Sequence, residues 1–210
     1  MEAYEIAERT EHLPDMASSI GDIGLLHENQ LDYNTALSYY YKQYDIHEKA
    51  LELDQDFITE QHLFIDLILI VKSYKKNDNL KMAFRFCQHK LDQQKRTIPE
   101  NHPRIGYTLN MIGNIYFYFG KVDKALEYYL QVSEVFDHSQ TCEHVTMITC
   151  LRMIGAMMFD KENYDDGLSY LLKVLDIEKK TDDPNLASSY KSIGDIYCKT
   201  KIIKKHSIII

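Results

Sequence analysis

Apolar and polar residues along the chain recur with the period of amphipathic α-helices. In five stretches, apolar residues stand three and four positions apart, as they do on the buried face of a helix. Short polar segments divide four of these stretches into halves, and only four prolines and eight glycines interrupt the 210 residues. The pattern predicts an all-α protein built from helices joined by short turns.

The five stretches repeat one another in a single frame. Each has an anchor residue, and successive anchors are separated by 47, 42, 42 and 39 residues. The anchors are Gly24, Val71, Gly113, Gly155 and Gly194. Each anchor directly follows an isoleucine, which we expect to contact the core. A period of this length is typical of a helical solenoid.

A second set of positions predicts how the two helices of each repeat meet. Twelve residues after the anchors stand Ala36, Ala83, Ala125 and Gly167, and sixteen after them stand Tyr40, Cys87, Tyr129 and Leu171. Small residues on both helices allow the backbones to approach closely, and the larger side chains fill the space beside the contact. The short turns require antiparallel pairs. Pro14, Pro103 and Pro184 stand where three of the first helices are expected to begin.

This pattern of small and aromatic residues closely resembles the tetratricopeptide repeat (TPR). The segment "TIPENHPRIGYTLNMIGNIY", Thr97 to Tyr116, also resembles the boundary between the long repeats of kinesin light chains. The resemblance covers nearly the whole chain. It implies a right-handed superhelix of antiparallel helix pairs, in which the first helix of each pair faces a concave groove. The second repeat departs most from the pattern, because Val71 replaces the glycine and its connection is five residues longer.

The repeat frame also divides the chain into segments. We expect 1–14 to be the tail of a preceding helix and an N-terminal boundary, and 15–199 to be the repeat array. Its units are about 15–56, 57–102, 103–143, 144–183 and the incomplete 184–199, and 200–210 is expected to be a truncated C-terminal helix or tail. Both ends have the pattern of an interrupted array, which favours a fragment of a longer chain or, alternatively, self-association through exposed ends.

The face of the first helices opposite the core supplies the candidate groove. It carries six basic and three acidic residues, a net +3, which leaves −11 for the rest of a chain whose total charge is −8. The candidate binding residues on this face are Lys72, Lys75, Lys76, Tyr107, Asn110, Asn114, Phe117, Tyr118, Arg152, Phe159, Lys191, Asp195 and Lys199.

A basic groove in an acidic scaffold predicts an extended protein ligand with acidic side chains or a terminal carboxylate. Asn110 and Asn114, one helical turn apart, would hold the ligand backbone, and the resemblance to TPR proteins implies the same role. Arg152 would make a bidentate contact with a carboxylate, and the aromatic residues would form an apolar pocket. In the alternative interpretation, the lysines form an ordinary solvated face and the aromatic residues only pack.

Chemistry of other kinds finds little support in the sequence. His138, Cys142, His144 and Cys150 have the side chains of zinc ligands, but their spacing matches no standard zinc site, so no metal is predicted. No phosphate-binding loop, nucleophile elbow or H-E-x-x-H motif is present. We therefore expect neither an enzyme nor a bound cofactor.

The charge and hydropathy of the chain limit its expected partners and its expected location in the cell. The acidic total argues against nucleic acid, and no apolar run is long enough to span a membrane. The N-terminus lacks the regions of a signal peptide, so a cytoplasmic protein is expected. The predicted function is a non-catalytic protein-interaction scaffold, with a kinesin-light-chain-like cargo adaptor as its sharper version. A self-associating structural array is the alternative, and a ligand-sensing regulator of the bacterial peptide-binding kind stays open.

Overall fold

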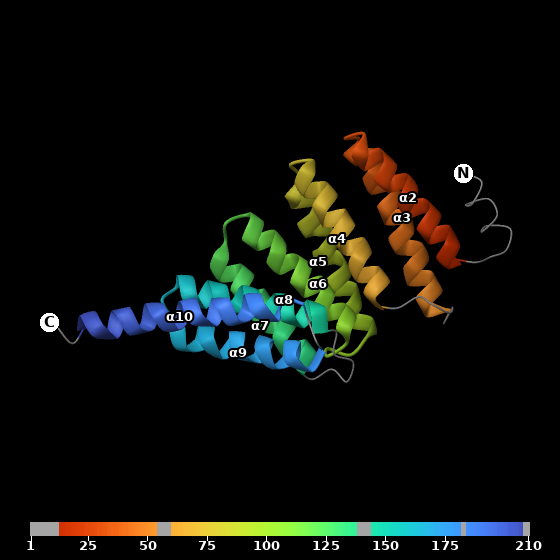
Figure 1. Ribbon diagram of the computed structural model, residues 1–210. Helices are drawn as coiled ribbons and strands as arrows, with labels where there is room; N and C mark the ends of the chain where they lie inside the picture. Colours follow the sequence, from red (N-terminus) through yellow and green to blue (C-terminus); the bar gives the residue numbers. More distant parts are fainter. Residues whose placement is uncertain (1–12, 54–59, 138–143, 182–183, 208–210) are drawn as a thin grey trace.

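The computed structural model describes residues 13–53, 60–137, 144–181 and 184–207, and over these ranges the chain consists of α-helices and short turns (Figure 1). The helices are α2 (Leu13–Asn29), α3 (Tyr33–Glu52), α4 (Glu60–Lys76), α5 (Leu80–Thr97), α6 (Pro103–Tyr118), α7 (Val122–Asp137), α8 (His144–Asp160), α9 (Tyr164–Thr181) and α10 (Leu186–Ser207). No helix in these ranges is both long enough and apolar enough to cross a membrane.

The helices stack side by side in chain order as antiparallel pairs. The pairs are α2–α3, α4–α5, α6–α7 and α8–α9, and α10 follows as the first helix of a fifth repeat (Figure 1). We call the first helix of each repeat its A helix and the second its B helix. The all-α solenoid of helix pairs predicted from the sequence is confirmed.

One turn type joins the two helices of every pair. Each turn is three residues long, and its middle residue has a positive φ: 63° at Leu31, 51° at Asp78, 70° at Gly120 and 62° at Glu162. The last turn residue donates its backbone N–H to the carbonyl five positions back, as from Asp32 to His27 (3.0 Å) and from Lys121 to Tyr116 (2.9 Å). This is the hydrogen-bond pattern of the Schellman motif, which ends the A helix and reverses the chain.

Side chains of the B helices pack directly onto glycines of the A helices. A Cβ at Gly24 would lie 2.7 Å from Cε1 of Tyr40, and a Cβ at Gly113 would lie 2.9 Å from Cε1 of Tyr129. The small residues of the B helices are buried at Ala36, Ala83, Ala125 and Gly167. The predicted close approach of the two backbones is therefore confirmed, with the tyrosine ring lying on the glycine.

The isoleucines before the anchors supply the centre of the core. Ile70, Ile112, Ile154 and Ile193 are buried as expected. Ile23 is only half-buried, because in the described part of the chain α2 has neighbours on one side only. The main core cluster extends from α3 to α9, and Leu171, Leu175, Ile193 and Ile196 form a separate small cluster at the C-terminal end.

The last A helix exposes positions that are buried or partly buried in the others. Tyr190 and Tyr197 are 50% and 54% exposed, and a Cβ at Gly194 would meet no atom within 4 Å. Among the described residues, no B helix covers this face. Helix α10 also continues to Ser207 without a turn, so residues 200–207, expected to be a truncated C-terminal helix or tail, extend the A helix of the fifth repeat. Residues 1–12 of the expected segment 1–14 lie outside the described part, as do residues 208–210.

Candidate functional site

Two neighbouring pockets open along the A helices. The central pocket has a volume of about 530 Å³ and is lined by Phe64, Ile68, Val71, Lys72, Lys75, Asn110, Met111, Asn114, Tyr118, Val145, Thr146 and Thr149. The C-terminal pocket, of about 420 Å³, is lined by Arg152, Met153, Gly155, Ala156, Phe159, Asp160, Leu171, Ser188, Ser189, Ser192, Asp195 and Ile196. Successive turns of α8 line first one pocket and then the other. The two pockets bring together eight of the thirteen candidate residues.

The central pocket combines an apolar floor with two cations and two amides. Lys72 and Lys75 are the charged residues among those that line it, and Nζ of Lys75 lies 3.7 Å from the centroid of the Tyr118 ring. The hydroxyl of Tyr129 donates a hydrogen bond of 2.6 Å to Oδ1 of Asn114. The Tyr129 ring packs on Gly113, so the repeat packing also fixes the orientation of the Asn114 amide. The Tyr118 ring and the Tyr129 hydroxyl therefore hold the side chains of Lys75 and Asn114 in position at the pocket.

Two candidate residues of α6 are less accessible than the sequence indicated. Tyr107 is 1% exposed, with its ring centroid 4.6 Å from that of Phe64 and 5.7 Å from that of Phe136. Its assignment to an exposed groove is wrong. Asn110 is 4% exposed and belongs to the wall of the central pocket, not to an open surface. Helix α6 packs on α4 and α5 as well as on its partner α7, so its buried arc is wider than the helical wheel of one isolated pair suggests.

Lys76 is placed outside both pockets by a buried carboxylate. Glu28 of α2 is 3% exposed and accepts hydrogen bonds from Tyr40 (2.9 Å), Ser73 (3.1 Å) and Lys76 (2.5 Å). Burial alone would raise the pKa of Glu28, but these hydrogen bonds outweigh it and hold the pKa below its usual value of 4.5. The ammonium group of Lys76 is thus paired with Glu28, and the hydrogen bonds to Glu28 join α2, α3 and α4. Lys72 lies farther from Glu28, with 4.0 Å between Nζ and Oε1.

A second buried carboxylate lies behind the wall of the C-terminal pocket. Glu178 of α9 is fully buried and accepts hydrogen bonds on Oε1 from Arg152 of α8 and from Ser189 of α10, the latter at 2.9 Å. Arg152 also lies 3.4 Å from Ser189 Oγ. The guanidinium that the sequence assigned to a ligand carboxylate therefore already neutralises one within the chain.

The remaining candidates lie at the edges of this pocket or away from it. Phe159 lines it, and Nζ of Lys199 lies 4.3 Å from the Phe159 ring centroid. Asp195 also lines it. Lys191 is exposed on α10 and Phe117 on α6, and neither lines either pocket.

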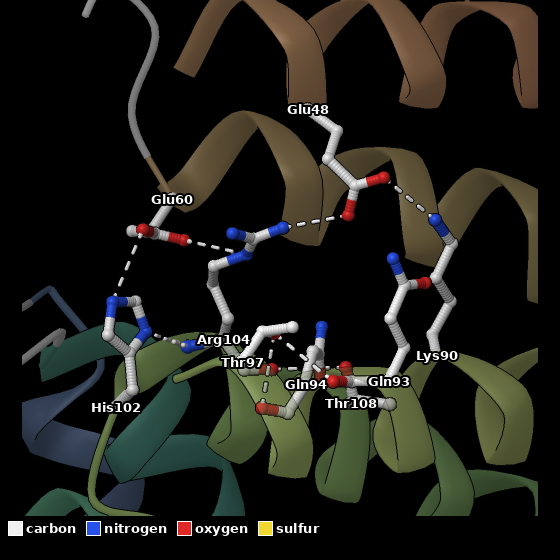
Figure 2. Close-up of polar contacts among 9 residues, drawn as sticks. All are labelled: Glu48, Glu60, Lys90, Gln93, Gln94, Thr97, His102, Arg104 and Thr108. Carbon is white, nitrogen blue, oxygen red and sulfur yellow. Dashed lines mark hydrogen bonds and ion pairs between the residues drawn. The ribbon is translucent and has the colours of Figure 1, made fainter. Parts of the chain in front are cut away.

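A charged network that the sequence did not indicate joins the first three repeats. Glu48 of α3 accepts hydrogen bonds from Lys90 of α5 (2.9 Å) and Arg104 of α6 (2.8 Å), as Figure 2 shows. Arg104 Nε lies 3.5 Å from Glu60 of α4, which lies 3.7 Å from Nε2 of His102. Burial and the nearby Arg104 lower the pKa of His102. The network joins four helices and lines neither pocket, so its role is structural.

The cysteine and histidine cluster lies largely outside the described part of the chain. His138 and Cys142 are not described, nor is the side chain of His144. Cys150 is buried in α8, its Sγ lies 3.2 Å from the carbonyl oxygen of Tyr129, and burial raises its pKa to about 12. Within the described ranges, no group of three or more His, Cys, Asp or Glu side chains is arranged to hold a metal ion.

Comparison with known proteins identifies the architecture. No family model and no curated protein matches the sequence. The crystal structure of BtubC (BKLC) from P. vanneervenii is similar over 100% of this chain and 84% of its own, with a TM-score of 0.73 and 15% identity. A Podosopora anserina protein, described as a kinesin light chain with nearly identical TPR-like repeats, is similar over 90% and 88%, with a TM-score of 0.61 and 15% identity. The fold is that of a TPR-type helical repeat protein.

A third similar structure carries a ligand. It is PlcR of Bacillus thuringiensis in complex with the peptide PapR7 and DNA, similar over 88% of this chain and 63% of its own, with a TM-score of 0.55 and 13% identity. At these identities the similarity shows the TPR-type fold alone. The resemblance to long kinesin-light-chain repeats agrees with the second structure, and the peptide complex describes PlcR.

Proposed function

We propose that this TPR-type chain is a non-catalytic interaction scaffold that binds an extended segment of another protein along its A helices. The observation that carries the proposal is the pair of adjoining pockets on this face, lined mostly by residues that share the same repeat offsets. TPR-type folds generally serve protein–protein interaction, and PlcR was crystallised with a peptide. Function is carried by the site and not by the fold, so the test addresses the pockets.

The central pocket supports a ligand segment with an acidic group. Lys72 and Lys75 provide charge, Asn110 and Asn114 provide amides for a peptide backbone, and Ile68 with its neighbours provides an apolar floor. In this proposal Lys76 does not contact the ligand, because Glu28 holds its ammonium group.

The test is binding of fluorescent acidic peptides to the wild-type chain and to Lys72→Ala/Lys75→Ala. We expect the variant to lose affinity by about tenfold or more, because each charge-assisted hydrogen bond contributes about that much. Lys49→Ala/Lys81→Ala is the matched control, since it removes the same charge from exposed positions of α3 and α5. Equal loss in both variants would mean that net charge, and not the pocket, governs binding.

Replacing Asn110 and Asn114 is a poorer test of the proposal than replacing the two lysines, although both asparagines stand on the predicted groove face. Asn110 is buried and Asn114 accepts a hydrogen bond from Tyr129, so replacing them also disturbs the packing of α6 on α7. The lysines are exposed and their loss leaves these contacts in place.

The exposed face of α10 supports a second candidate, self-association. Tyr190, Gly194 and Tyr197 occupy positions that a B helix covers in the other repeats. Sedimentation of the wild-type chain and of Tyr190→Ser/Tyr197→Ser distinguishes the candidates. A concentration-dependent dimer that the substitutions abolish supports assembly through this face, and a monomer at all concentrations rejects it.

A further inference from the structure

The two pockets of the A-helix face differ in charge. In the central pocket, the charged residues of the lining are Lys72 and Lys75, and the nearest carboxylate, Glu28, is occupied by Lys76. This pocket therefore presents two positive charges to a ligand. The Nζ of Lys72 lies 4.0 Å from Glu28 Oε1, at the outer limit of an ion pair, and the side chain is 56% exposed, so it can turn toward a ligand.

The C-terminal pocket has the opposite character. The charge of its Arg152 is cancelled by the buried Glu178, which leaves Asp160 and Asp195 in the lining. In the described part of the chain, neither aspartate forms an ion pair. Asp160 ends α8, where the helix dipole adds partial negative charge. Lys199 lies over the Phe159 ring at the rim and cancels only one of the two aspartates.

A buried acceptor lies behind the wall of this pocket. Oε2 of Glu178 accepts no hydrogen bond in the described part of the chain, although the residue is fully buried. The carboxylate lies behind Arg152 and Ser189, which form the pocket wall. Because Glu178 is fully buried and does not line the pocket, its charge is set only against that of Arg152, and Asp160 and Asp195 remain the acidic groups that a ligand meets.

We propose that the ligand is a peptide with charges of both signs, whose acidic part occupies the central pocket and whose basic part occupies the C-terminal pocket. This inference rests on the proposed function and replaces a purely acidic ligand with a bipolar one. A lysine or arginine side chain suits the C-terminal pocket, because either has an apolar stem for Phe159 and Ala156 and a cationic end for the aspartates. The two charges set the register of the peptide along α8.

The test uses a printed array of short peptides in which a glutamate pair and a lysine pair are separated by variable spacers. For the strongest bipolar binder, the dissociation constant is compared with that of its Lys→Gln analogue by fluorescence polarisation. We expect the bipolar peptide to bind about tenfold more tightly, as for one charge-assisted contact. This advantage should vanish in Asp160→Asn/Asp195→Asn, whose affinity for the analogue should equal that of the wild type.

The matched control is Asp22→Asn/Asp165→Asn, which removes the same charge from exposed positions outside both pockets. It should keep the tenfold advantage. Equal affinity of the bipolar peptide and its analogue for the wild-type chain overturns the bipolar ligand and leaves the scaffold function standing. So does an equal effect of the two aspartate variants. Failure of every charged peptide to exceed a neutral control at low salt overturns both proposals.

Discussion

Gly113 and Gly194 hold the same repeat position but have different surroundings. A Cβ at Gly113 would lie 2.9 Å from the Tyr129 ring, whereas one at Gly194 would meet nothing within 4 Å. We expect Gly113→Ala to lower the free energy of unfolding by about 1–3 kcal/mol, because the buried ring must shift. Gly194→Ala should raise it by up to about 1 kcal/mol through helix propensity. Urea denaturation followed by circular dichroism measures both, and equal changes would contradict the packing argument.

Leu31 holds a positive φ in an exposed turn where a glycine is more favourable. Its φ is 63° and its side chain is largely exposed, so Leu31→Gly relieves backbone strain and loses little burial. We expect the melting temperature to rise, with a gain of up to about 1 kcal/mol after the entropy of the unfolded glycine is subtracted. Gly120→Ala, at the equivalent turn, should lower the melting temperature, with a loss of stability of similar size. A lower melting temperature for Leu31→Gly would refute this account.

The residue types in the sequence predict the close contacts between paired helices but not the backbone conformation of the turns. The glycines and alanines between the helices recur in most repeats, so the close approach of each pair is readable from the sequence. The positive-φ position recurs as well, seven residues after each of the first four anchors, but it is glycine only at Gly120. A backbone conformation that four different residues adopt leaves no compositional signal.

At the scale of the helices, Arg152 joins α8 to α9 and α10 through Glu178 and Ser189. Arg152→Ala would leave a fully buried carboxylate without its cation, which typically costs about 3 kcal/mol or more. Adding Glu178→Gln removes the unpaired charge, so the double variant should be more stable than Arg152→Ala alone. Thermal unfolding of the two variants and the wild type checks this order. A double variant no more stable than Arg152→Ala would show that the charge itself is unimportant.

Glu28 makes the junction of α2, α3 and α4 sensitive to acid. Its pKa is lowered in the folded chain, so it contributes stability above its usual value of 4.5 and loses that contribution as the pH falls below this value. In Glu28→Gln this titration is absent. The difference in melting temperature between the wild type and the variant should therefore shrink as the pH falls from neutral to below 4.5. A difference that stays constant with pH would exclude Glu28 as the source.

These inter-helix contacts explain what the sequence could not predict about the site. The repeat pattern fixes which residues share a helix face, and it correctly grouped Lys72, Lys75 and Asn114. It contains no information about partners from distant segments, such as Glu28 for Lys76 or Glu178 for Arg152. It also treats every A helix alike, although α6 lies between two others. Its exposed arc is therefore narrower, and Tyr107 is buried.

At the scale of the whole molecule, the buried apolar contacts are distributed along the stack of helices and not gathered in one centre. The main core cluster extends from α3 to α9, whereas α10 contributes Ile193 and Ile196 to a separate small cluster. In a solenoid each repeat contacts chiefly its neighbours, so local stability depends on how many faces of a helix are covered. Helix α6 is covered by α4, α5 and α7, while α10 packs chiefly on α9 in the described part of the chain.

This arrangement predicts a gradient of hydrogen exchange and a local response to mutation. Amide hydrogens of α6 should exchange last and those of α10 first, as measured by mass spectrometry of proteolytic fragments after deuterium labelling of the intact chain. Arg152→Ala, which cuts the contact between α8, α9 and α10, should accelerate exchange in α10 and leave α6 unchanged. Gly113→Ala should do the reverse, since it acts on the packing of α6 against α7. Uniform acceleration by either variant would mean that the chain unfolds as one cooperative unit, contrary to the one-dimensional packing of its repeats.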